Sequence, residues 1–166
     1  MSEASSGQVV DGQVPGGQVR GPGVGVGLYA EIQQFYARQA GLLDDGRAVE
    51  WARTFTEDGV FRDASRPQDA LVGRRAIGTQ AGAHHDRRVA EGVDVRHWLG
   101  MLDLRAEDDG SLRVRSYALT PSTGRDGSGL RISASVVCHD RLVRENGRWY
   151  VADRTLRRDG VVIPVN

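Results

Sequence analysis

Apolar side chains recur at helical spacing between residues 32 and 43. The apolar positions are Ile32, Phe35, Tyr36, Leu42 and Leu43, and Gln39 is the polar break among them. This spacing predicts an amphipathic helix, and the Asp-Asp-Gly sequence at 44–46 predicts the turn that ends it. A second short helix is expected next, with Trp51 and Phe55 on one side, before TEDG at 56–59 stops it and Val60 begins a strand. Two helices that lead into a strand predict a lid over a sheet, which would enclose a pocket.

Further along the chain the pattern changes from helical to extended. A glycine-interrupted helical stretch covers roughly 74–90, and strands are expected over 94–106, 112–120, 130–144 and 148–157. Helices first and an antiparallel meander afterwards indicate the α+β class. We therefore predict a strongly curved antiparallel sheet that wraps around the N-terminal helices and forms a cone with an internal pocket.

The first 27 residues differ in composition from the rest of the chain. The sequence GQV recurs at 7–9, 12–14 and 17–19, glycine is dense, and aromatic residues are missing from this stretch. Such a segment buries too little apolar surface to offset its ordering entropy. We predict a disordered glycine-rich tail over 1–27 and a single folded domain over 28–166; a partner-binding arm is the alternative for the tail.

Composition narrows the function classes. The formal net charge is zero over 166 residues, so no basic field is expected to recruit nucleic acid or a membrane surface. No signal peptide or membrane span is expected, and the single cysteine, Cys138, suits a reducing compartment. All basic residues are arginine, which removes lysine chemistry such as Schiff bases. We expect a cytoplasmic protein.

His97 is the leading candidate for chemistry. Strict alternation from Val95 places His97, Leu99 and Met101 on one face of a strand and Trp98 on the other. A histidine on an otherwise apolar face suits general acid or base catalysis, because imidazole titrates nearest to neutral pH. The alternative is a core histidine that is bonded to a backbone carbonyl.

Two carboxylates are further candidates. Asp44, followed by Asp45, ends the first helix, where negative charge is unfavourable, and this hints at another requirement; ordinary turn chemistry is the alternative. Asp63 shares a strand face with Phe61, and desolvation in a cavity would raise its pKa and make it a proton carrier. A solvated strand end is the alternative for Asp63.

The remaining polar candidates are weaker. Tyr36 and Tyr117 could donate hydroxyl hydrogen bonds to a substrate carbonyl, or serve as core aromatics. The run His84-His85-Asp86 lacks a partner at metal-ligand spacing, so an exposed polar helix or loop is expected there. His139 has no companion either. We predict no metal and no cofactor.

Three segments carry a family resemblance: IQQFYARQAGLLDDGRAVEWARTFTEDGVF at 32–61, RHWLGMLDL at 96–104 and ENGRWYVADRTLRR at 145–158. Together they resemble the nuclear transport factor 2-like superfamily over roughly residues 28–158. Within this superfamily the chain resembles SnoaL-like proteins, scytalone dehydratase and the small subunits of aromatic-ring dioxygenases. The resemblance implies a cone fold, and it covers enzymes as well as non-catalytic subunits.

The resemblance also implies residue roles. His97 matches a catalytic histidine of the dehydratase, Asp44 a carboxylate that orients it or holds a water, and Asp153 an acidic residue of SnoaL-like cyclases. An ion pair between Asp153 and a nearby arginine is the alternative. The second histidine of the dehydratase has no counterpart in ALTPSTG at 118–124, so cyclisation or a one-base proton transfer fits better than dehydration by that route.

Two functions remain open at this point. One is an enzyme of secondary metabolism that cyclises, isomerises or dehydrates an aromatic polyketide-type intermediate by acid–base chemistry, in which His97 is helped by Asp44, Asp63 or Asp153. Its apolar pocket would be built from Phe35, Tyr36, Trp51, Phe55, Phe61, Leu99 and Met101, with Tyr117 nearby. The other is a non-catalytic binding protein, or the small partner of a pathway oxygenase or reductase.

Apolar residues on the opposite face of the same strand predict self-association. Alternation places Trp98, Leu102 and Leu104 away from His97, where a monomer would expose them. Burial against a two-fold-related copy would cover this surface, so we predict a homodimer.

Overall fold

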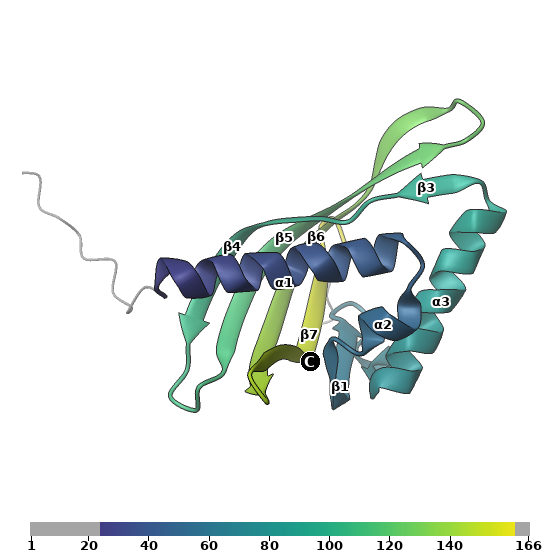
Figure 1. Ribbon diagram of the computed structural model, residues 1–166. Helices are drawn as coiled ribbons and strands as arrows, with labels where there is room; N and C mark the ends of the chain where they lie inside the picture. The colour runs from purple at the N-terminus through teal and green to yellow at the C-terminus, as the bar shows by residue number, and fades with distance from the viewer. Residues whose placement is uncertain (1–23, 162–166) are drawn as a thin grey trace, which may run out of the picture.

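The computed structural model describes residues 24–161 (Figure 1). Within this range the elements in chain order are α1 (Val26–Asp44), α2 (Ala48–Ala52), β1 (Phe55–Asp63), the 3-10 helix η1 (Pro67–Asp69), β2 (Leu71–Val72), α3 (Arg74–Ala90), β3 (Val93–Val95), β4 (Trp98–Ala106), β5 (Leu112–Gly124), β6 (Gly129–Glu145) and β7 (Arg148–Arg158). Helix α1 begins two residues before the predicted domain start. The predicted tail otherwise lies outside the described residues.

The strands form one curled sheet in the order β2-β1-β7-β6-β5-β3, and β4 also pairs with β5. The predicted α+β cone is confirmed, and the sheet is mixed because β1 runs parallel to β7. Strand β1 also begins earlier than expected, at Phe55, so that TEDG lies within β1. The register of β1 on β7 shifts between Phe55 and Val60, which marks an irregular stretch there.

Helix α1 lies across the inner face of the sheet (Figure 1). The helix buries one stripe of side chains at the predicted helical spacing, Ile32, Phe35, Tyr36 and Gln39. They pack with inward-facing side chains of the long strands, among them Leu104, Leu112, Val114 and Leu142. At one end of the cone, Trp51, Phe55 and Phe61 make edge-to-face contacts with ring centroids 5.0 to 6.3 Å apart. Such aromatic pairs add about 0.5–1.5 kcal/mol each beyond area burial.

A bulge in β4 overturns part of the predicted alternation. The register of β4 on β5 shifts between Gly100 and Asp103, and Met101 has a left-handed φ of 56°. Met101 was expected to face the pocket; its side chain is instead 75% exposed on the outer face, the side of the sheet away from α1. Leu104, expected on the outer face, is buried in the core, and Leu102 packs against that core.

A second bulge, in β7, has the same effect on the last strand. Asp153 pairs with Arg141 of β6 whereas Val151 pairs with Leu142, so Ala152 is an extra residue. Asp153, predicted to share a face with Val151, therefore lies on the outer face. Arg154 takes the inward position instead and is 6% exposed.

The inward turn of Arg154 creates a buried polar network. Asp140 and Arg154 are direct cross-strand partners, and their side chains join through Asp140 Oδ2 and Arg154 Nη2 at 2.6 Å. Tyr36 donates its hydroxyl to Asp140 Oδ2 at 2.7 Å, and Arg154 Nη2 also donates to Gln39 Oε1 at 2.8 Å. The network ties α1 to β6 and β7 in the centre of the cone.

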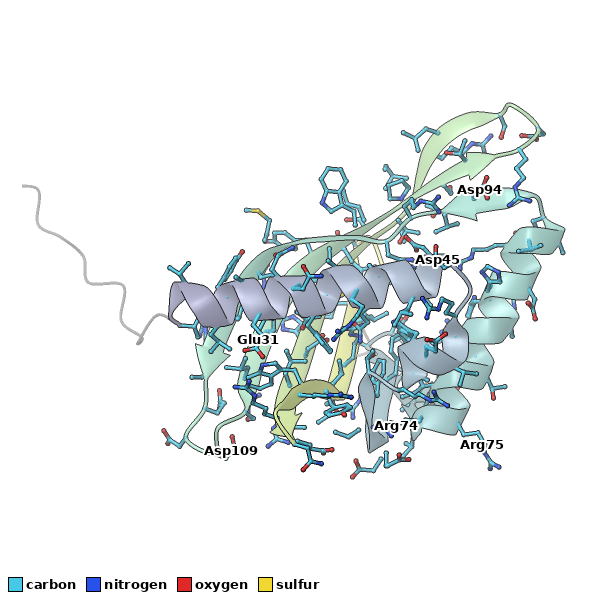
Figure 2. All side chains as sticks on the ribbon, in the orientation of Figure 1. Glu31, Asp45, Arg74, Arg75, Asp94 and Asp109 are labelled. Atoms are coloured by element: carbon cyan, nitrogen blue, oxygen red, sulfur yellow. The ribbon has the colours of Figure 1, made fainter. Side chains whose placement is uncertain are left out.

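Many of the other charged side chains lie at the periphery. Figure 2 shows Asp109 at the tip of the β4–β5 turn and Arg74 and Arg75 at the start of α3. Within residues 24–161 no helix combines the length and apolar content that a bilayer crossing requires.

Candidate functional site

A cavity of about 510 Å³ opens between the three helices and strands β1, β2 and β7. Its apolar lining consists of Leu43, Trp51, Phe61, Leu71, Ile77, Ala81 and Leu156. Its polar lining consists of Asp63, Arg66, Asp69, Gln80, His84, Arg88, His97 and Arg158. Concave sites with an apolar wall and a few convergent polar groups are typical of small-molecule binding.

The end of α1 places Asp44 next to His97, which lines this cavity. Gly46 N–H donates to the Leu43 carbonyl at 3.3 Å, and Arg47 N–H donates to the Leu42 carbonyl at 2.9 Å. These two bonds form the Schellman arrangement that terminates helices at a left-handed residue. Gly46 supplies that conformation, with φ of 73°, and a Cβ there would lie 2.4 Å from the His85 ring. The predicted Asp-Asp-Gly turn therefore fixes Asp44 as the last helical residue.

His97 lies at the break between β3 and β4, where the ladder to β5 is interrupted. Its backbone N–H is free of the ladder and donates to Asp44 Oδ2 at 3.1 Å. Its ring Nδ1 lies 2.6 Å from Asp44 Oδ1. One carboxylate thus holds both the backbone and the ring of His97, and these bonds offset the unfavourable charge of Asp44 at the helix C-terminus.

The tautomer of His97 follows from this contact. An ionised carboxylate only accepts hydrogen bonds, so the neutral imidazole carries its proton on Nδ1, and Nε2 is then the acceptor nitrogen. The Asp44 side chain is 10% exposed and that of His97 is 21% exposed, so the pair is shielded while His97 still lines the cavity. An imidazole that is oriented by a carboxylate has the arrangement that general-base chemistry requires.

Asp63 lines the cavity as expected, but its ionisation differs from the prediction. Burial acts to raise its pKa, and hydrogen bonds from Ser65 and Arg158 outweigh burial, so the pKa lies below the ordinary 3.8. Ser65 donates to Asp63 Oδ1 through its backbone N–H at 2.9 Å and its hydroxyl at 2.6 Å. Arg158 Nε donates to Asp63 Oδ2 at 2.8 Å. The expected raised pKa is therefore wrong, and the carboxylate anchors Arg158.

The lowered pKa of Asp63 gives a pH-dependent stability. The ionised carboxylate stabilises the fold above the ordinary pKa of 3.8, and this contribution is lost as pH falls through the lower folded-state pKa. In an Asp63→Asn variant, urea unfolding is expected to show a smaller loss of stability than wild type between about pH 4 and pH 2. Asp58→Asn, exposed on the same strand, is the control. Parallel pH profiles for Asp63→Asn and wild type would contradict this assignment.

Helix α3 adds residues that the sequence analysis left outside the site. Gln80, His84 and Arg88 recur every four residues and line the rim of the cavity, with Ile77 and Ala81 also in its wall. Burial lowers the pKa of His84, and the charges of Arg87, Arg88 and Arg158 lower it further. The prediction of a polar helix at His84 is confirmed, and its place at the cavity was missed.

The other predicted pocket residues lie in four different environments. Trp51 and Phe61 line the cavity, whereas Phe35, Tyr36 and Phe55 are fully packed in the core. Leu99 is half-buried and packs against the core clusters. Tyr117, like Met101, lies on the outer face; its side chain is 41% exposed and its hydroxyl accepts a bond from Arg115 at 2.7 Å.

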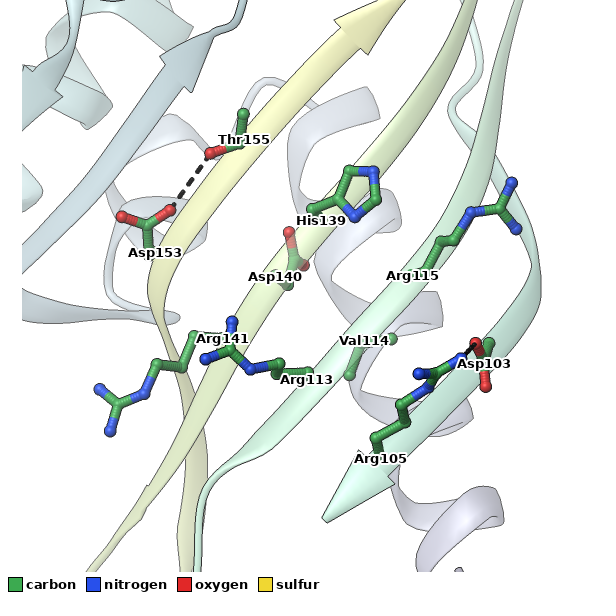
Figure 3. Close-up of a pocket in the computed structure, with 10 residues that line it drawn as sticks. All are labelled: Asp103, Arg105, Arg113, Val114, Arg115, His139, Asp140, Arg141, Asp153 and Thr155. Carbon is green, nitrogen blue, oxygen red and sulfur yellow. Dashed lines mark hydrogen bonds and ion pairs between the residues drawn. The ribbon is translucent and has the colours of Figure 1, made fainter. Parts of the chain in front are cut away.

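The outer face carries its own polar hollow, of about 590 Å³ (Figure 3). Its lining includes Arg105, Arg113, Arg115, His139, Arg141, Asp153 and Thr155. Asp153 accepts a bond from Arg62 Nη2 at 2.6 Å, which is the ion pair considered above as the alternative to a catalytic role. Asp153 is therefore separated from His97 by the sheet.

The fold and the site together define a small cone-shaped α+β protein with a ligand-sized cavity, lined by a histidine that an aspartate holds. A family model of the SnoaL-like domain matches residues 26–155. The chain belongs to the SnoaL-like domain family, and the predicted resemblance is confirmed.

Solved structures give the same result. ActVI-ORFA from Streptomyces coelicolor is 32% identical with a TM-score of 0.76, over 83% of this chain and 99% of that one. Aln2 from another Streptomyces species is 29% identical with a TM-score of 0.75, over 83% of this chain and 95% of that one. A protein from Catenulispora acidiphila, solved in complex with S-DNPA, is 38% identical with a TM-score of 0.71, over 81% of this chain and 96% of that one. No protein of curated function matches the chain significantly.

Proposed function

We propose that this protein is a cofactor-independent acid–base enzyme of secondary metabolism that acts on an aromatic polyketide-type ketone. The observation that carries the proposal is the His97–Asp44 pair: His97 lines the cavity, and its Nε2 has no hydrogen-bond partner among residues 24–161. The similarity to a relative that was solved in complex with S-DNPA supports a small-molecule ligand.

The chemistry follows from the tautomer. His97 Nε2 removes a proton from the carbon next to a ring carbonyl, and the C–H electron pair forms an enolate. Asp44 stabilises the resulting imidazolium and keeps the ring aimed at the cavity. For ring closure, the enolate carbon attacks a second carbonyl carbon of the substrate, and the oxygen of that carbonyl takes the proton from the imidazolium. For isomerisation, the enolate takes this proton back at another position. For dehydration, the enolate expels a hydroxyl group from the neighbouring carbon, and that group takes the proton and leaves as water. Trp51 and Phe61 provide an apolar surface for the aromatic part of the substrate.

The proposal is tested with 2-tetralone, a ring ketone with exchangeable protons next to its carbonyl. In D₂O the wild-type protein is expected to accelerate deuterium incorporation above the buffer rate, as measured by mass spectrometry. A His97→Gln variant should lose the acceleration yet still bind the ketone. If both proteins bind 2-tetralone and neither accelerates exchange, the cavity serves binding alone, as in the non-catalytic alternative.

We also propose a homodimer that forms through the outer face; of the residues first predicted for it, Trp98 is kept and Leu102 and Leu104 belong to the core side. The exposed apolar side chains there are Trp98 at 70%, Met101 at 75%, Tyr117 at 41% and Leu119 at 39%. Next to them lies a surface that contains both arginines and carboxylates (Figure 3). A face that carries both signs of charge beside an apolar patch can complement a second copy of itself.

The dimer is tested by sedimentation velocity. Wild-type protein is expected to be dimeric at micromolar concentration, and Trp98→Glu is expected to be monomeric, because a charge would be buried in the interface. Val49→Glu is the matched control: Val49 is 66% exposed on α2, away from the outer face. A wild-type protein that sediments as a monomer would contradict the proposal.

A further inference from the structure

The cavity wall contains a guanidinium group, that of Arg158, which is held in place through one nitrogen only. Arg158 Nε donates to Asp63, which is itself held by two bonds from Ser65. Among residues 24–161, the terminal nitrogens of Arg158 have no hydrogen-bond partner, and the side chain is 43% exposed. Arg158 is therefore positioned at the cavity wall with donors still available.

Arg88 is a second cationic group in the same wall, and it has no counterion. It lies in the last turn of α3 and is half-buried, yet its side chain forms no hydrogen bond or ion pair with any described residue. Arg88 and Arg158 both line the cavity beside His84, and their charges, after burial, lower the pKa of His84. An unpaired arginine that lines a ligand-sized cavity is a candidate anion receptor.

The formal charges of the lining suggest which anion fits. The positive charge of Arg158 is balanced by the negative charge of Asp63. Arg66 and Asp69, which are both exposed, contribute one positive and one negative charge. The charge of Arg88 is left over, so the wall suits one negative charge. The forked donors of guanidinium groups match the two oxygens of a carboxylate.

We infer that the substrate carries a carboxylate, bound by Arg88 and the free terminal nitrogens of Arg158, while its aromatic body packs against Trp51 and Phe61. This inference rests on the proposed function only in taking the cavity as the substrate site. It assigns Arg88 and Arg158 to substrate binding and leaves the proton transfer to His97.

Matched ligands test the inference. 1-Naphthylacetate and 1-naphthylacetamide share one ring system and nearly one size, and differ in charge. By isothermal titration calorimetry, wild-type protein is expected to bind the acid about tenfold more tightly than the amide, the size of one charge-assisted hydrogen bond. Arg88→Gln should remove most of that preference and leave the amide affinity unchanged, which also shows that the variant is folded. Arg75→Gln, exposed at the start of the same helix, should behave as wild type (Figure 2).

Several results would overturn the inference. Equal affinity of wild type for the two ligands would do so, as would an unchanged acid affinity in Arg88→Gln or no binding of either ligand. Tighter binding of 1-naphthyl phosphate than of the acid would exclude a carboxylate site. These outcomes are independent of His97. If wild type shows no preference for the acid but its exchange depends on His97, only this inference is rejected. If exchange does not depend on His97, only the proposed catalysis is rejected.

Discussion

Replacing His97 by Gln is expected to lower the rate of deuterium exchange into 2-tetralone by about 10²–10⁴-fold, the usual contribution of a positioned general base. Gln has a similar reach and can bond to Asp44, but its amide does not accept a proton from carbon at neutral pH. Because the cavity lining is otherwise unchanged, ketone binding should remain within about twofold of wild type. The loss should therefore fall on the rate of the bound complex.

Asp44→Asn tests the positioning role separately. An Asn amide can donate to Nδ1 and so favour the tautomer whose Nε2 carries the proton, which cannot act as the base. We expect a loss of about 10²-fold in the exchange rate with little change in ketone affinity. In the double variant the two losses should not add, because Asp44 acts only through His97. Additive losses would show an independent role for Asp44, and full activity of Asp44→Asn would contradict the orienting contact.

Asp45→Asn is the control for both variants. Asp45 follows Asp44 in the same turn, and its carboxylate makes no contact with His97 among the described residues. Like Asp44→Asn, the Asp45→Asn substitution removes one negative charge from the C-terminal end of α1. Wild-type exchange in Asp45→Asn and loss in Asp44→Asn would assign the effect to the His97 contact rather than to the local charge.

The parts of the fold that follow from local sequence were predictable. Helical spacing located α1 and α3, and the Asp-Asp-Gly signal located the Schellman end that presents Asp44. His97 was identified from an imidazole in an apolar strand pattern, supported by the family resemblance. These signals act over a few residues, so a single sequence contains them.

The two β-bulges could not be read from alternation. A single extra residue in a strand moves every side chain beyond it to the opposite face of the sheet from the one that alternation predicts. The bulge at Met101 moves Met101 to the outer face and Leu104 into the core. The bulge at Ala152 turns Arg154 inward and Asp153 to the outer face. Neither position carries a glycine or proline that would signal the irregularity, although Gly100 precedes Met101.

The polar wall of the cavity was missed because it is assembled from distant segments. Arg88 and Arg158 come from α3 and β7, and only the curl of the sheet brings them to one cavity with His97. A local signal existed in the i, i+4 spacing of Gln80, His84 and Arg88, which places them on one helix face. The sequence alone does not show which face of that helix meets the cavity.

The largest expected effect on stability lies in the buried network, not in the site. Replacing Asp140 by Ala is expected to lower the free energy of unfolding by about 3–5 kcal/mol, because it leaves a buried guanidinium without its partner. Burial acts to lower the pKa of Arg154, and the charge and hydrogen bonds of Asp140 outweigh it, so Arg154 stays charged in the fold. Tyr36 would also lose the acceptor of its hydroxyl. Urea unfolding followed by tryptophan fluorescence measures the change.

Asp103→Ala is the matched control. Asp103 is also paired with an arginine of the sheet, Arg105 at 3.3 Å, but the side chains are 51% and 75% exposed. Exposed pairs contribute about 0–1 kcal/mol, so this variant should unfold close to wild type. Equal losses in Asp140→Ala and Asp103→Ala would contradict the account of the network.

The double variant Asp140→Leu/Arg154→Met separates the contribution of the ion pair to stability from that of the volume its side chains fill. Apolar side chains of similar size remove both desolvation costs at once, and such replacements are often neutral or stabilising. We expect the double variant to recover most of the stability that Asp140→Ala loses. If it stays as unstable as the single variant, the network would contribute through its bonds to Tyr36 and Gln39, which tie α1 to the sheet, rather than through the balance of two buried charges. Because these residues lie in the core and outside the cavity lining, 2-tetralone exchange by the folded double variant should match wild type.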